Sequence, residues 1–169
     1  MTKNYKDITT EWIKNASPNT HKVKNQLYFK HKNKKYCVDK KNVVLDYTKK
    51  EKEIAIWLEN NFGGEIYMLP RINYPEGIQT ANYLFRNEYW DLKEITGQGK
   101  NILYHAIEDH EKQATNFIFD FSKSSLTDAE IFTRISKLYT YNKVSWLNKI
   151  IIKREDKIIC IIKRDNPSD

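Results

Sequence analysis

The spacing of apolar residues along the chain changes repeatedly between a helical and a strand-like period. Residues that recur every three or four positions predict amphipathic helices, and alternating residues predict half-buried strands. The clearest helix follows Thr48 and ends at Gly63-Gly64, with Ile54, Trp57 and Leu58 on its apolar side. Helices are predicted at residues 9–15, 48–62, 101–114 and 127–139, the last of them begun by a capping box of Thr127 and Glu130.

Short runs rich in β-branched and aromatic residues separate these helices and predict strands. Strands are predicted at residues 26–31, 35–38, 42–46, 65–69, 116–121, 146–153 and 157–164, with a tight hairpin inside residues 79–95. From residue 50 onward the predicted order is therefore α-β-β-β-α-β-α-β-β. This alternation favours a mixed α/β (α+β) fold.

The hairpin is the most informative local feature. Two strand-like runs flank the dipeptide Arg86-Asn87, and a two-residue loop fixes the register of the strands around it. In that register Phe85 lies opposite Glu88, and Tyr83 lies opposite Trp90.

The same register sets three polar residues together on one face. Asn82 lies across from Asp91, and Lys93, two residues further along the strand, shares the face of Asp91. Trp90 and Leu92 point to the other side, into a core. The hairpin is thus predicted to carry an acidic and basic cluster.

The chain of 169 residues is long enough for one domain with a substantial core. We expect a single domain over residues 50–169, with an α-β-β-β-α-β core, an extra helix and a C-terminal hairpin. Residues 1–49 are expected to form a basic N-terminal appendage.

Positive charge is concentrated at the N-terminus. The first 50 residues hold 13 Lys and 4 acidic residues, a net charge of +9, whereas the remaining residues hold 16 Lys plus Arg and 18 acidic residues, a net charge of −2. Lysines interleaved with aromatic residues suit phosphate neutralisation and base stacking. An ordinary solvated surface would have a similar composition. The candidate nucleic-acid-binding residues are Lys22, Lys24, Lys30, Lys32, Lys34 and Lys35.

No apolar run is long enough to span a bilayer, and the N-terminus lacks the apolar segment of a secretory signal. Cys37 and Cys160 lie far apart in the sequence and indicate neither a disulfide framework nor a cysteine metal site. The oligomeric state is left open.

Nucleases that cut phosphodiesters with a divalent metal use carboxylates to hold the ion and a lysine to stabilise developing charge. The pattern of Asn82 followed by Asp91-Leu92-Lys93, between α-β units, resembles the PD-(D/E)xK nuclease superfamily. The resemblance places the first motif acid at Asn82, the second at Asp91 and the lysine at Lys93. Glu53 would supply an extra acid, and Gln113 a polar residue on the following helix.

Asn82 departs from the pattern of that superfamily, which has a carboxylate there. Three explanations are compatible with it: a metal-independent variant, weak binding of Mg²⁺ or Zn²⁺ through Asp91 and Glu53, or an inactivating replacement. The cofactor is therefore a divalent metal or none.

A longer string resembles the C-terminal tRNase domains of CdiA-type contact-dependent growth inhibition toxins and related polymorphic toxins. The string runs through Gly63-Gly64-Glu65, Asn82-Tyr83-Leu84, Glu88 to Lys93, Gly99-Lys100-Asn101, Lys112-Gln113-Ala114 and Phe117 to Asp120. The resemblance implies cleavage of tRNA and neutralisation by a cognate immunity protein. It also implies delivery as part of a larger secreted or cell-surface toxin, with action in the cytoplasm of the target cell.

Other readings remain open. Some toxins of this kind adopt a barnase-like fold that cuts RNA without metal, and Lys93, Lys100, His105 or His110 would then carry the reaction. Lys100 follows Gly97-Gln98-Gly99 and could bind phosphate at the rim of the site. The alternatives from other classes are a DNA endonuclease and a catalytically dead nucleic-acid-binding module.

Overall fold

A computed structural model describes residues 4–165, apart from the side chains of residues 18–21. The chain forms two compact units. Unit 1 holds residues 4–12, 92–111 and 115–165 of the described chain, and unit 2 holds residues 13–91 and 112–114. The mixed α/β class predicted from the sequence is confirmed.

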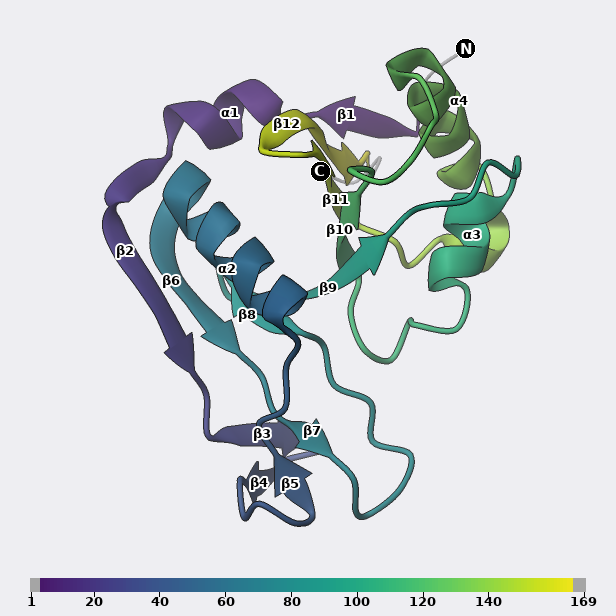
Figure 1. Ribbon diagram of the computed structural model, residues 1–169. Helices are drawn as coiled ribbons and strands as arrows, with labels where there is room; N and C mark the ends of the chain where they lie inside the picture. The colour runs from purple at the N-terminus through teal and green to yellow at the C-terminus, as the bar shows by residue number, and fades with distance from the viewer. Residues whose placement is uncertain (1–3, 166–169) are drawn as a thin grey trace. The chain divides into compact units, whose positions relative to one another are not determined.

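Unit 2 is built from the helix α2 and a set of short strands, drawn in purple to teal in Figure 1. Its elements are β2 (Ser17–Asn25), β3 (Tyr28–His31), β4 (Lys34–Cys37), β5 (Val43–Val44), α2 (Lys49–Phe62), β6 (Gly63–Met68), β7 (Arg71–Ile72), β8 (Tyr83–Phe85) and the first part of β9 (Glu88–Glu94). The main sheet runs β9-β8-β6-β2, with β2 parallel to β6 and the other pairs antiparallel. Two further pairs, β3–β4 and β5–β7, are antiparallel.

The predicted hairpin register is confirmed. Tyr83 pairs with Trp90, and Phe85 pairs with Glu88. Arg86 and Asn87 both have positive φ, 53° and 63°, which is the backbone of a two-residue type I′ turn. The strand β9 then passes from unit 2 into unit 1 between Asp91 and Leu92.

The helix α2 packs along β2 and β6, as Figure 1 shows. Its N-terminus carries a complete capping box, in which the side chains of Thr48 and Glu51 each accept a hydrogen bond from the backbone N–H of the other. Ile54, Leu58 and Phe62 are buried at helical spacing and supply its core face. Gly63 ends the helix with a φ of 71°.

Unit 1 contains the C-terminal half of the chain together with the first strand. Its elements are β1 (Tyr5–Asp7), the start of α1 (Thr9–Lys14), the end of β9, α3 (Ile102–Ile107), β10 (Asn116–Asp120), α4 (Asp128–Leu138), the 3-10 helix η1 (Asn142–Val144), β11 (Lys149–Arg154) and β12 (Lys157–Arg164). The strand order is β1-β12-β11-β10-β9, with β10 and β11 parallel. The pairs β1–β12 and β11–β12 are antiparallel.

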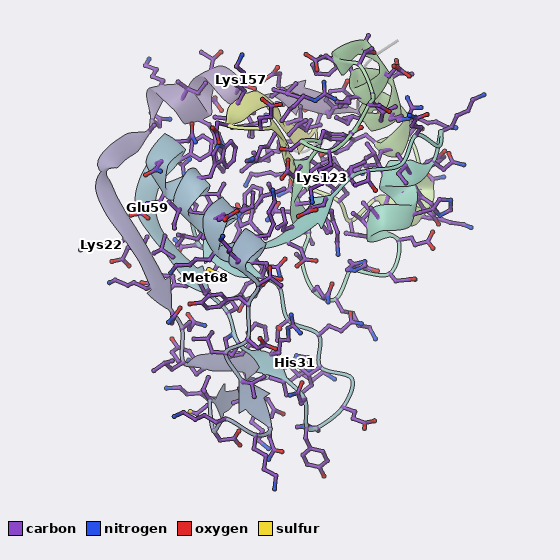
Figure 2. All side chains as sticks on the ribbon, viewed as in Figure 1. Lys22, His31, Glu59, Met68, Lys123 and Lys157 are labelled. Atoms are coloured by element: carbon purple, nitrogen blue, oxygen red, sulfur yellow. The ribbon has the colours of Figure 1, made fainter. Side chains whose placement is uncertain are left out.

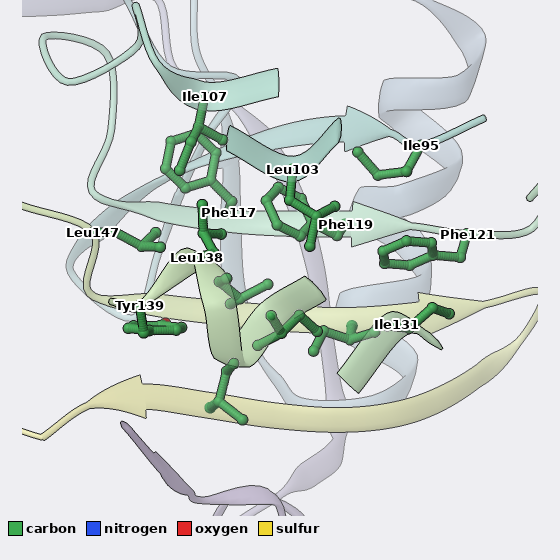
Figure 3. Packing of buried hydrophobic residues seen from close by; sticks show 14 of the residues in the cluster. Ile95, Leu103, Ile107, Phe117, Phe119, Phe121, Ile131, Leu138, Tyr139 and Leu147 are labelled. Atoms are coloured by element: carbon green, nitrogen blue, oxygen red, sulfur yellow. The ribbon is translucent and has the colours of Figure 1, made fainter. Parts of the chain in front are cut away.

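The core of unit 1 forms around β10, whose five residues are all buried. Figure 3 shows Phe117 and Phe119 of this strand packed with Leu103 of α3 and Leu138 of α4. A central strand covered on both faces is continuously apolar, as this one nearly is. The helix α4 begins with the predicted capping box of Thr127, and its last turn buries Ile135 and Leu138.

The helix predicted at residues 101–114 was too long. Only Ile102–Ile107 are helical, and residues 108–113 form turns. Ala114 is buried in unit 2 rather than on a helix of unit 1, so tertiary packing overrides the apolar spacing. Residues on both sides of the expected boundary at 49 and 50 lie in unit 2, where β2 pairs with β6.

Within residues 4–165, none of the helices combines the length and the apolar character that crossing a membrane requires.

The contact between Gly63 and β2 yields a stability prediction. A Cβ at Gly63 would lie 1.7 Å from the backbone oxygen of Ser17, whereas a Cβ at Gly64 would meet nothing within 4 Å. Both glycines have positive φ, so Gly64→Ala should cost about 1–2 kcal/mol. Gly63→Ala should cost more than about 4 kcal/mol, because β2 must also move away from β6. Urea unfolding of the two variants measures the difference, and equal losses would contradict the close packing.

Candidate functional site

A small apolar cluster lies at the centre of unit 2. Its buried members are Phe29, Val43, Leu69, Ile72, Ala81 and Ala114. Four of them are direct chain neighbours of polar residues: Lys30, Arg71, Asn82 and Gln113. The cluster therefore brings segments that are distant in the sequence to one place.

Asp91 is the most deeply buried acid of this region, with 4% of its surface exposed. The backbone N–H of Asn82 donates to its Oδ1 at 3.3 Å, as expected for residues opposite each other in the hairpin. The carbonyl of Asn82 accepts from the backbone N–H of Leu69 at 3.1 Å. Since Trp90 is also buried and points to the opposite side, both faces of β9 are covered at this point.

The carboxylate of Glu51 lies close enough to Asp91 to interact with its charge. Burial raises the pKa of Glu51, the Thr48 backbone N–H and Arg71 oppose that shift, and the nearby negative charge of Asp91 adds to it. The Tyr83 hydroxyl donates to the backbone oxygen of Glu51 at 2.6 Å. Burial, and then the charges of Glu51 and Asp91, raise the pKa of Tyr83 far above that of a free phenol, so its proton stays in place.

Glu53, the acid predicted from the sequence, has a different environment. Its side chain is 56% exposed and lies 3.9 Å from Lys49 in an i,i+4 pair. The helix period explains the difference, because Glu51 precedes Ile54 by three residues and shares the buried stripe of α2. The apolar face of this helix was predicted from the sequence, but Glu51 was not among the predicted site residues.

Gln113 lies in a turn before β10 and not on a helix. Its Oε1 is buried and accepts no hydrogen bond from the described residues. A buried amide oxygen without a donor costs free energy, so such groups call for a ligand, a water or an ion. Gln113 adjoins Ala114 of the small apolar cluster, in the same unit as Asp91.

Lys93 is half-buried on β9, and the pleat of that strand places it on the same side as Asp91. Lys100 is exposed in unit 1 at the turn before α3. Arg134 holds that turn by donating to the backbone oxygens of Gln98 and Gly99, at 2.6 and 3.1 Å.

The candidate nucleic-acid-binding lysines are all exposed in unit 2. Lys30, Lys32, Lys34 and Lys35 lie on the β3–β4 hairpin or its turn, while Lys22 and Lys24 lie on β2. Figure 2 marks Lys22 on β2 and His31 at the end of β3. Phe29 of the hairpin contacts Tyr89 of β9, with ring centroids 5.5 Å apart, two residues before Asp91.

These lysines differ in their partners. Lys24 is bound to Glu65, with 2.9 Å between Nζ and Oε1, and this hydrogen bond raises the pKa of Lys24. Lys35 instead lies over the ring of Tyr28, 4.3 Å from its centroid. A cation over an aromatic ring keeps its full charge available to a phosphate.

The donor set around Asp91 suits a hard cation. Carboxylate and amide oxygens are ligands that Mg²⁺ accepts, and Mg²⁺ is often held by one or two carboxylates together with substrate phosphates. Asp91 and Glu51 supply two carboxylates, and unit 2 also contains the buried Oε1 of Gln113, an oxygen that Mg²⁺ accepts as well. Among residues 4–165, His, Cys, Asp and Glu form no group of three or more placed to hold a metal.

The raised pKa of Glu51 has a consequence for stability. The folded protein binds this proton more tightly than the unfolded chain, so the stabilisation present at low pH is lost as pH rises above the ordinary value of 4.5. Glu51→Gln keeps a capping-box side chain and mimics the protonated acid, so it should gain stability over the parent protein as pH rises from 4 to 7. Glu51→Ala lacks the same titrating group but also lacks the cap, so it should be about 0.3–1.5 kcal/mol less stable than Glu51→Gln at each pH in that range. Denaturant unfolding in the presence of EDTA measures both, and a pH-independent difference for Glu51→Gln would contradict the shift.

Comparisons with known proteins agree with this architecture. Residues 79–158 match the family model described as the contact-dependent growth inhibition CdiA C-terminal domain. No curated protein matches the sequence. A solved CdiA-CT/CdiI toxin and immunity complex from Burkholderia pseudomallei contains a chain with 22% identity and a TM-score of 0.51, over 68% of this chain and 82% of that one. The structural likeness concerns the fold, and the segment from 79 to 158 is similar in sequence to the CdiA C-terminal domain.

Proposed function

We propose that this protein is a toxin-like ribonuclease that cleaves tRNA. The observation that carries the proposal is the buried carboxylate of Asp91, held by the backbone of Asn82 beside Glu51, with Lys93 next on the same face of β9. Two like charges that lie close together and are partly buried cost free energy, and such pairs are found most often at functional sites. The match of residues 79–158 to a toxin domain supports this reading.

RNA cleavage needs a base, an acid and a cation around one phosphodiester. The base removes the proton of the ribose 2′-hydroxyl, whose oxygen then forms a bond to phosphorus as the bond from phosphorus to the 5′-oxygen breaks. The 5′-oxygen takes its proton from the acid. Asp91, whose carboxylate accepts a hydrogen bond from the backbone of Asn82, suits the role of the base. Glu51, whose pKa is raised, suits the role of the acid.

The remaining groups would act on the phosphate and on orientation. Lys93 would stabilise the negative charge that develops on the phosphate oxygens. Asn82 and Gln113 would hold the substrate or the carboxylates through their amides. If Mg²⁺ is bound, Asp91 and Glu51 would hold it with Gln113 nearby, and the ion would neutralise phosphate charge and lower the pKa of a bound water.

The basic β3–β4 hairpin supports a nucleic-acid substrate of extended size. Its exposed lysines are anchored through Phe29 to the small apolar cluster and to Tyr89, close in sequence to Asp91. This arrangement would let the phosphate backbone bind the hairpin while one phosphodiester reaches Asp91. A folded RNA such as tRNA presents phosphates over that range.

We also propose that the chain is delivered as the C-terminal part of a larger toxin and acts in the cytoplasm of the target cell. A cognate immunity protein would neutralise it there. The support is the family matched by residues 79–158 and the fold shared with a toxin that was solved together with its immunity protein.

Replacing Lys93 by Ala should lower the rate of cleavage of total tRNA by about 10²- to 10³-fold, because one group that stabilises the transition state is lost. Asp91→Asn should be at least as damaging. Lys157→Ala, on an exposed position of β12, is the matched control and should keep the parent rate. Gel analysis of tRNA fragments measures the rates, and circular dichroism checks folding. Full activity of a folded Lys93→Ala protein would refute the assignment.

The same assay with EDTA, and with Mg²⁺ or Zn²⁺ added back, decides the role of a metal. If cleavage stops in EDTA and returns with Mg²⁺, Asp91 and Glu51 act as ligands of the ion. If cleavage continues in EDTA, these two acids act by proton transfer. Plasmid DNA serves as the second substrate. Cleavage of DNA alone would favour the endonuclease alternative, and binding without any product would identify an inactive module with Asn82 at its centre.

The lysines of the hairpin should set the salt dependence of tRNA binding. Replacing Lys30, Lys32 and Lys35 by Gln, one at a time, should each reduce the slope of log Kd against log salt by about 1. Lys24→Gln should change it less, because Glu65 already neutralises Lys24. Fluorescence anisotropy of labelled tRNA measures the slopes in the Lys93→Ala background, and equal slopes for all variants would remove the hairpin from the interface.

A further inference from the structure

Unit 1 contains a cavity that the proposed reaction does not use. Its volume is about 340 Å³, and it lies between α3 and the segment that follows α4. The lining residues are Asn101, Tyr104, His105, Tyr141, Asn142 and Lys143. Three of the six are aromatic, and all of them lie in unit 1.

The aromatic rings of this cavity are held in position. Tyr104 and Tyr141 meet edge to face, with centroids 5.3 Å apart, and His105 meets Tyr104 at 5.6 Å. Tyr104 and Tyr141 also pack against the core of unit 1. Rings that are already fixed lose little freedom when a flat ligand stacks on them.

The side chains of Asn101 and Tyr141 form a hydrogen bond that does not serve to cap α3. Asn101 precedes α3 at the capping position, but its side chain makes no capping hydrogen bond. Its Oδ1 instead accepts from the Tyr141 hydroxyl at 2.7 Å. This leaves the amide N–H groups of Asn101 as donors at the cavity wall, where they could read an acceptor on a base edge.

Cations surround the aromatic rings. Lys143 lines the cavity and is exposed, and Lys137 lies 5.9 Å from the centroid of the Tyr141 ring. Stacking rings beside lysines are the combination by which proteins hold single-stranded nucleotides, the rings taking the base and the cations its phosphate. The volume is at the small end of the range of about 300–1,000 Å³ for ligand sites, which suits one nucleotide.

We propose that this cavity binds one unstacked nucleobase of a single-stranded RNA segment, with the adjoining phosphate at Lys143. The proposal rests on the proposed ribonuclease function for its choice of RNA. The site would capture a loop or end of the substrate by stacking on Tyr104 and Tyr141, with His105 at the rim and Asn101 contacting the base edge.

The test compares two probes that carry the same charge. One is a short fluorescein-labelled oligouridylate, and the other is the abasic ribose-phosphate oligomer of equal length. The Lys93→Ala protein should bind the oligouridylate more tightly, and Tyr141→Ala in that background should weaken this binding by about 5- to 100-fold. Binding of the abasic oligomer should be unchanged by Tyr141→Ala.

Matched variants separate stacking from damage to the fold. Tyr141→Phe keeps the ring and should bind more tightly than Tyr141→Ala. His105→Ala removes a ring that is 64% exposed, together with its surface contact to Glu108, and should weaken binding with a loss of stability of no more than about 1 kcal/mol. Phe132→Ala removes an exposed aromatic of α4 that does not line the cavity, and it should bind as the parent does.

Equal affinity of Tyr141→Ala, His105→Ala and the parent for the oligouridylate would overturn the proposal, as would equal loss with the abasic probe. Tighter binding of an oligothymidylate than of the oligouridylate would overturn the choice of RNA. These binding results are independent of cleavage. If tRNA is cut but the variants bind normally, the cavity assignment fails alone, and if binding depends on Tyr141 but no RNA is cut, the ribonuclease function fails alone.

Discussion

The packing of the small apolar cluster in unit 2 is the constraint on which the candidate site depends. Small residues, Ala81 and Ala114, pack there with Leu69 and Ile72. Three of these residues are chain neighbours of polar residues, namely Asn82, Gln113 and Arg71. Close packing leaves little room for any of these segments to shift by itself. The packing of their apolar neighbours therefore helps to position Asn82, Gln113 and Arg71.

The apolar packing is needed because burial of the polar groups of the site opposes folding. Asp91 is buried, the pKa of Glu51 is raised, and the Oε1 of Gln113 lacks a donor among the described residues. Each of these features costs free energy in the isolated protein. The apolar cluster, the capping box of α2 and the pairing of β8 with β9 offset that cost. A substrate or an ion that satisfied these groups would then bind to a site that is already formed.

In unit 1, too, buried residues hold a more exposed segment in place. Its β10 strand is enclosed on both faces, and the side chain of Arg164 ties the end of β12 to the segment after α4 by donating to the backbone oxygens of Leu147 and Val144, at 2.7 and 3.0 Å. The Tyr139 ring lies under that guanidinium, with 4.9 Å from its centroid to Cζ. The segment that carries Tyr141 and Lys143 is thus fixed at its base, while its outer residues remain exposed.

The sequence by itself determined the local features whose causes are local. The two-residue loop at Arg86-Asn87 sets the hairpin register, the spacing of Ile54 and Leu58 sets the face of α2, and Thr127 with Glu130 begins α4. These follow from strand pleat, helix period and capping chemistry, which act over a few residues. The placement of Asp91 and Lys93 on one face of a strand is also a local feature of this kind.

Only the tertiary structure decided which distant groups meet. It placed Ala114 in unit 2, outside the helix α3, which ends at Ile107. It also brought Glu51 near Asp91, because Glu51 lies on the side of α2 that carries Ile54. It also brought together Tyr104 of α3 and Tyr141 of the segment after α4. Such choices depend on the burial of apolar surface from several segments at once, and no single stretch of sequence contains that information.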